Sequence, residues 1–207
     1  MRSIKNNQIL RRNMRTLPCQ SNKLIEKELV RKMLHLPVFI FPFIALNSTL
    51  AALAVLILLA AGYLVILIYE KQFNKTVPIL STIILYCRRS TDYDLGPIYL
   101  ALGMIVALCL TSPRNVFYAA YVIAICDSAA SLIGMRFGRK QIPIFGKSYL
   151  GSLAFFATCF LGGLFYLTPL MSLVAALCLV VIELISIKGL DNFTLPVVSQ
   201  ILLLLMV

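Results

Sequence analysis

Long apolar segments alternate with short polar ones along the whole chain. Residues 49–69 are 21 consecutive residues without a charge, enough to cross about 30 Å of hydrocarbon at ~1.5 Å per residue. Six further segments are predicted helices with long apolar parts: residues 23–46, which are charged at first and apolar from Pro37 to Leu46, and residues 95–110, 116–135, 149–167, 170–187 and 193–207. The pattern predicts an all-α, polytopic membrane helical bundle with about seven transmembrane helices.

Two apolar segments are short. Residues 77–86 are too few to cross a bilayer, so we expect a short interfacial or re-entrant helix there. Residues 193–207 require local thinning of the bilayer or a truncated end if they cross it.

Composition supports a membrane protein. Of 207 residues, 60% are hydrophobic and 13% are charged, with a mean hydropathy of +0.92, outside the usual range of soluble domains. The first 32 residues are basic and have no apolar core of signal-peptide type, so we expect no cleaved targeting sequence. We expect residues 1–22 to form an arm against anionic headgroups or a disordered tail, and residues 23–207 to form one membrane-embedded catalytic domain.

The charges are segregated to one side of the predicted topology. If residues 77–86 do not cross, the N-terminal arm and the polar segments 70–94, 136–148 and 188–192 share a side, and Arg114 is the one charge in the opposite loops. The net charge of +11 places that side in the cytoplasm by the positive-inside rule. We therefore expect a cytoplasmic N-terminus, a site open to the cytoplasm, and no nucleic-acid partner.

Asp127 is a carboxylate inside an apolar segment, which by default indicates a functional site. Ala130 and Gly134 share its helix face and allow a ligand or another helix to approach. Mg²⁺ or a basic partner would keep the carboxylate charged. The alternative is a structural aspartate paired with a lysine or arginine of a neighbouring helix.

The loop that follows has the chemistry of a phosphate site. Gly138 and Gly146 permit turns, and Ser148 stands where a new helix begins. Backbone amides at a helix N-terminus bind phosphate well when a lysine lies beside them. The candidate contacts are Arg139, Lys140, Gly146, Lys147, Ser148 and Gly151. A basic cytoplasmic loop without a ligand is the alternative.

The first apolar segment carries polar residues on one face, because Glu28, Arg31, Lys32 and His35 follow helical spacing. A salt-bridged juxtamembrane face is the alternative to a functional one. Near the C-terminus, Glu183 needs a partner such as Lys147, while Asp191 and Asn192 are candidate metal ligands or ordinary helix caps.

Four motifs in this order resemble the CTP-dependent lipid kinases, a family of dolichol, phytol and polyprenol kinases and a diacylglycerol kinase, distantly similar to phosphatidate cytidylyltransferases. The motifs are E-x-x-R-K-x-x-H from Glu28, D-x-x-A…G…F-G from Asp127, G-K-S-x-x-G-S from Gly146 and E…D-N-x-x-x-P from Glu183. The longer proline-lysine-lysine motif expected of cytidylyltransferases is missing, which favours a kinase.

The resemblance implies Mg²⁺-dependent transfer of a phosphoryl group from CTP to a membrane alcohol such as a polyprenol, dolichol, phytol or geranylgeraniol. On this hypothesis Asp127, Asp191 and Asn192 hold the metal, Lys147 and Ser148 hold phosphate, and Arg31 and Lys32 add positive charge. Either His35 or Glu28 accepts the proton of the alcohol. A CDP-lipid synthase and a non-enzymatic transporter are the alternatives, and the sequence leaves homodimerisation open.

Overall fold

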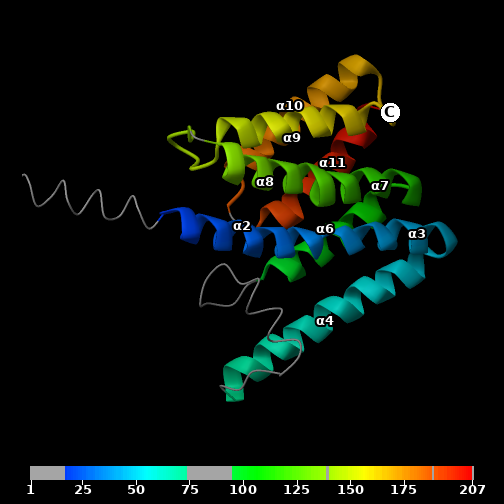
Figure 1. Cartoon of the computed structure of the whole chain (residues 1–207). Helices are drawn as coiled ribbons and strands as arrows, with labels where there is room; N and C mark the ends of the chain where they lie inside the picture. Colours follow the sequence, from blue (N-terminus) through cyan, green and yellow to red (C-terminus); the bar gives the residue numbers. More distant parts are fainter. Residues whose placement is uncertain (1–16, 74–94, 139, 188, 207) are drawn as a thin grey trace, which may run out of the picture.

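The computed structural model describes residues 17–73, 95–138, 140–187 and 189–206, with side chains from residue 25 onward. These residues form an all-α bundle (Figure 1). Its helices, in chain order, are α2 (Leu17–Met33), the 3₁₀-helix η1 (Leu36–Phe39), α3 (Ile40–Asn47), α4 (Thr49–Phe73), α6 (Gly96–Leu110), α7 (Pro113–Tyr121), the π-helical turn η2 (Val122–Cys126), α8 (Asp127–Phe137), α9 (Tyr149–Gly163), α10 (Pro169–Ile185) and α11 (Asp191–Met206).

The seven apolar segments predicted to span a membrane are all helical. Three helical stretches, Ile25–Asn47, Thr49–Phe73 and Pro113–Phe137, are long and apolar enough to cross a bilayer. Shorter apolar helices account for the other four segments: Gly96–Leu110, Tyr149–Gly163, Pro169–Ile185 and Asp191–Met206. The chain is thus an integral membrane protein by composition and helix length. The predicted interfacial helix at residues 77–86 lies outside the described residues.

The first helix differs from the prediction at both ends. It begins at Leu17, six residues before the predicted start at residue 23, and Pro18 falls in its first turn, where proline is favoured. It ends at Met33 instead of continuing, and η1 separates it from α3. Pro37 has no N–H to donate to the preceding turn, which favours a break in the α-helix at this point.

Helix α11 is central to the bundle. It packs against α6 and α7 on one side and α10 on another, while α9 packs against both α8 and α10. Helix α4 diverges from the rest in Figure 1 and contacts mainly α3 and α6. The loop between α8 and α9 lies at the same end of the bundle as the start of α2, and the α3–α4 turn lies at the opposite end.

Close backbone contact between α6 and α11 depends on Gly103. A Cβ atom at this position would lie 2.9 Å from the carbonyl oxygen of Asn192 and 3.0 Å from Cα of Phe193. Both neighbours are backbone atoms of α11, so neither can turn aside as a flexible side chain would.

We expect Gly103→Ala to lower the free energy of unfolding by about 1–3 kcal/mol because it separates α6 from α11. Gly62→Ala is the matched control, since Gly62 is also within a long apolar helix but has no atom within 4 Å of the added Cβ. The control should be neutral or stabilising by up to about 1 kcal/mol, as alanine favours helix. Unfolding of both variants in detergent micelles measures the difference, and equal stabilities would contradict the packing argument.

Candidate functional site

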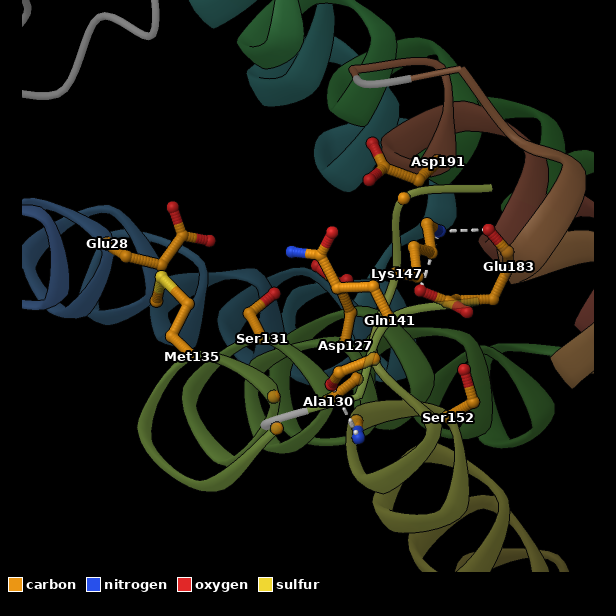
Figure 2. Close-up of a pocket in the computed structure, with 15 residues that line it drawn as sticks. Glu28, Asp127, Ala130, Ser131, Met135, Gln141, Lys147, Ser152, Glu183 and Asp191 are labelled. Atoms are coloured by element: carbon orange, nitrogen blue, oxygen red, sulfur yellow. Dashed lines mark hydrogen bonds and ion pairs between the residues drawn. The ribbon is translucent and has the colours of Figure 1, made fainter. Parts of the chain in front are cut away.

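A cavity of about 370 Å³ opens at the end of the bundle that carries the α8–α9 loop (Figure 2). It is bounded by α2, α8, that loop, α9, the end of α10 and the start of α11. Its lining residues are Glu28, Asp127, Ala130, Ser131, Gly134, Met135, Gly138, Gln141, Gly146, Lys147, Ser148, Gly151, Ser152, Glu183 and Asp191. The cavity therefore brings together segments from all four motifs found in the sequence.

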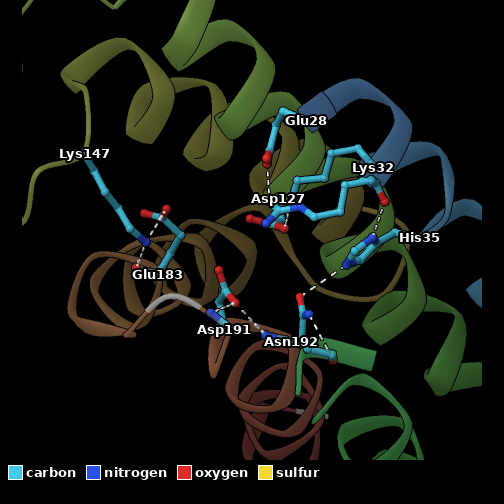
Figure 3. Close-up of polar contacts among 11 residues, drawn as sticks. Glu28, Lys32, His35, Asp127, Lys147, Glu183, Asp191 and Asn192 are labelled. Atoms are coloured by element: carbon cyan, nitrogen blue, oxygen red, sulfur yellow. Dashed lines mark hydrogen bonds and ion pairs between the residues drawn. The ribbon is translucent and has the colours of Figure 1, made fainter. Parts of the chain in front are cut away.

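Asp127 forms an ion pair with Lys32, which joins α8 to α2 (Figure 3). The two side chains are 5% and 3% exposed, so each charge relies on the other in place of water. The sequence left open whether Asp127 is a structural ion-pair partner or a ligand-binding group. The ion pair is present, and Asp127 also lines the cavity. Its carboxylate therefore links two helices and is also available to the site.

A π-helical turn over Val122–Cys126 directly precedes Asp127. Such turns insert an extra residue into an α-helix and are frequent at functional sites. Here the turn sets the rotation of α8 relative to α7, and with it the direction of the Asp127 side chain. The apolar sequence of this segment gives no sign of the irregularity.

Small residues bring α8 and α9 close together beside the cavity. A Cβ on Gly134 would lie 2.7 Å from Oγ of Ser148, and one on Gly151 would lie 2.8 Å from the carbonyl oxygen of Ala130. Ser148 caps α9 as predicted, because its Oγ accepts a hydrogen bond of 3.0 Å from the amide of Gly151. The glycines thus place the start of α9 directly against the face that carries Asp127.

The α8–α9 loop is held in a tight turn. The amide of Ile142 donates to the carbonyl of Lys147 over 2.7 Å, and Gly146 has a φ of 63°, which favours glycine. Lys147 reaches across to α10 and donates to the carbonyl oxygen and to Oε1 of Glu183, the latter over 2.6 Å. The predicted pairing of Glu183 with Lys147 is therefore confirmed.

Asp191 and Asn192 begin α11 and have different roles. Oδ1 of Asp191 accepts hydrogen bonds of 3.0 Å from the amides of Gly189 and Asn192, which holds the turn that leads into α11, and the residue also lines the cavity. The side-chain amide of Asn192 donates to the carbonyl of Gly96 and its Oδ1 lies 3.3 Å from Nε2 of His35. Asn192 is not among the residues that line the cavity.

His35 is buried between two acceptors. Its Nδ1 donates to the carbonyl of Arg31 over 2.8 Å, and its Nε2 faces Oδ1 of Asn192. A neutral imidazole donates from one nitrogen only, so the second contact requires a protonated ring or a rotated Asn192 amide. His35 lies outside the cavity lining, whereas Glu28 lines it.

The other predicted phosphate contacts divide between inside and outside the cavity. Gly146, Lys147, Ser148 and Gly151 line it. Arg31 forms an ion pair with Glu28, and Lys32 pairs with Asp127, so both act next to a lining carboxylate. Lys140 is exposed away from the lining, and Arg139 lies outside the described residues.

The donor atoms suit a hard divalent cation. Among the described residues no group of three His, Cys, Asp or Glu side chains is arranged to hold a metal. Mg²⁺ in phosphoryl-transfer sites is usually held by one or two carboxylates together with substrate phosphates and water. Asp127 and Asp191 offer carboxylates to one cavity, which fits a cation that arrives with a phosphate ligand.

Several lining residues were not among the predicted site residues. Ser131 is four residues after Asp127 and Ser152 is four after Ser148, so helical periodicity would have indicated both. Oγ of Ser152 is buried without a hydrogen-bond partner in the described part of the chain. Gln141 lies in the loop, where spacing gives no such signal.

Comparison with known proteins gives one partial match and no function. No protein-family model matches the chain, and no solved structure matches it. An uncharacterized protein of Methanocaldococcus jannaschii is 41% identical over 81 residues. The match covers 39% of this chain and 42% of the relative, so it spans less than half of either protein.

The Lys32–Asp127 pair can be tested by a double-mutant cycle. Lys32→Met or Asp127→Asn alone should lower the free energy of unfolding by roughly 3–5 kcal/mol, because each leaves a buried charge without its partner. The double variant should recover most of that loss. Arg114→Met, which removes an exposed charge at the start of α7, is the control. Chemical unfolding in detergent micelles gives the four values, and simple additivity of the two losses would argue against the pairing.

Proposed function

We propose that the chain is a CTP-dependent lipid kinase that transfers the γ-phosphoryl group of CTP to the hydroxyl of a membrane alcohol. The observation that carries the proposal is the cavity itself. It joins carboxylates for a cation with the glycine-lysine-serine turn for phosphate, and it lies in a bundle of membrane-spanning length. A phosphate donor from water and an alcohol from the bilayer can meet at such a place.

Phosphoryl transfer depends mainly on positioning and on neutralising charge. Lys147, Ser148 and the backbone of Gly146 and Gly151 would contact the nucleotide phosphates at the start of α9. Asp127 and Asp191 would hold Mg²⁺, which when bound neutralises phosphate charge. Lys32 keeps the Asp127 side chain in a fixed position, and Asn192 anchors the start of α11 to Gly96 and His35.

The oxygen of the alcohol attacks the γ-phosphorus, the bond from that phosphorus to the β–γ bridging oxygen breaks, and CDP leaves. The proton of the alcohol passes to a base. Glu28 suits this role better than His35, because Glu28 lines the cavity while both ring nitrogens of His35 are engaged with Arg31 and Asn192. His35 is then a positioning residue.

The orientation follows the same proposal. The start of α2 and the α8–α9 loop share one end of the bundle (Figure 1), and residues of that loop line the cavity. This end would face the cytoplasm, where CTP is present, with the N-terminus on the same side.

Purified protein in lipid nanodiscs should convert CTP, Mg²⁺ and a prenol to prenyl phosphate and CDP. Parallel reactions with dolichol, phytol, geranylgeraniol and diacylglycerol, each with CTP, UTP, GTP and ATP, identify the alcohol and the nucleotide. Asp127→Asn should lower turnover by at least ~100-fold if the carboxylate holds the metal. Release of pyrophosphate with a CDP-lipid would replace the proposal by cytidylyl transfer, and no turnover of any pair would refute it.

Glu28→Gln should lower kcat by about 100-fold or more with little change in the KM for CTP, as expected for loss of a general base. His35→Gln should lower kcat less, because it disturbs the contacts with Arg31 and Asn192 but removes no proton acceptor from the cavity lining. Steady-state kinetics on both variants decides between the two residues. A larger loss of kcat in His35→Gln than in Glu28→Gln would assign the base to His35.

A further inference from the structure

Glu183 presents three oxygen atoms where α10 meets the cavity. Its carbonyl oxygen and Oε1 both accept hydrogen bonds from the Lys147 ammonium. Its Oε2 is buried and has no hydrogen-bond partner among the described residues, and the side chain is 8% exposed. Burial of a carboxylate oxygen without a hydrogen-bond partner costs free energy. A bound ligand at this atom would recover that cost.

The position of Glu183 near the end of a helix adds to the negative potential. Helix α10 ends at Ile185, two residues further on. Carbonyl groups in the last turn of a helix have no partner further along it, and the helix dipole makes this end favourable for cations. A carboxylate and a backbone carbonyl are also the oxygen ligands that hard divalent cations use. The Lys147 ammonium therefore occupies a place with the chemistry of a metal site.

We propose that Glu183 is a ligand of a divalent cation. The Lys147 ammonium occupies the position of this cation, as the counter-ion of Glu183, until the cation binds. Asp191, which lines the same cavity at the start of α11, supplies a second carboxylate (Figure 2). With Lys147 displaced, the Glu183 carboxylate would add its negative charge to those of Asp127 and Asp191, which line the same cavity.

Lys147 is able to exchange partners. It follows Gly146, which has a positive φ, and its side chain is 23% exposed, more than that of Glu183. An ammonium released from Glu183 would remain at the cavity wall beside Ser148. This exchange of partners rests on the proposed function. The cation binds Glu183 together with the nucleotide, and Lys147 moves from Glu183 to a phosphate oxygen.

Binding of Mn²⁺ to the full chain without nucleotide tests the exchange directly. Titration monitored by electron paramagnetic resonance in lipid nanodiscs gives the affinity of each variant. Lys147→Met should bind Mn²⁺ at least about tenfold more tightly than the unmodified protein, because a competing buried cation is gone. Glu183→Gln and the double variant Lys147→Met/Glu183→Gln should both bind about tenfold or more weakly than Lys147→Met. Arg114→Met is the control for loss of a positive charge and should match the unmodified protein.

A gain of affinity in Lys147→Met that disappears in the double variant supports the proposal, and misfolding cannot produce such a gain. Equal or weaker binding in Lys147→Met, or a gain that survives Glu183→Gln, overturns it. The result does not depend on catalysis. Failure of the Mn²⁺ pattern with intact CTP turnover removes only the cation role of Glu183, whereas the expected pattern without turnover removes only the kinase.

Discussion

Buried charge is the constraint on which the rest of this structure depends. In a chain of such high hydropathy, the ion pair of Lys32 with Asp127 and that of Lys147 with Glu183 lie at one end of the bundle. Each carboxylate is within a largely apolar segment of the chain, and each lysine comes from a different part of the chain. The need to neutralise two carboxylates therefore fixes how α2 meets α8 and how the α8–α9 loop meets α10.

These ion pairs become part of a cavity because the helices around them pack closely against one another. Gly134 and Gly151 allow α8 and α9 to touch, and Gly103 allows α6 to touch α11. With the helices this close, Ser148, Lys147 and Asp191 line one cavity with Asp127. A charge pair alone would be only structural. Charge pairs beside a helix N-terminus and a cavity have the parts that phosphate and metal chemistry require.

Hydropathy was sufficient to predict the helices, because residues in a bilayer must satisfy their backbone internally. It also indicated that Asp127 and Glu183 need partners. Lys147 was foreseeable for Glu183 because the predicted topology placed its loop on the side where the helix of Glu183 ends. Lys32 is 95 positions from Asp127, and spacing cannot choose among the basic residues of the chain. The π-helical turn before Asp127 and the break before Pro37 depend on tertiary packing and local backbone limits, which a hydropathy pattern does not carry.

The central claim is that the cavity directs the γ-phosphoryl group of a nucleotide to a lipid hydroxyl. Incubation of the protein in lipid nanodiscs with CTP labelled with ³²P at the γ-position, and separately at the α-position, tests it most directly. The account predicts that lipid extracts carry label from the γ-position and none from the α-position. Label from the α-position in the lipid fraction, or no label from either, would contradict it.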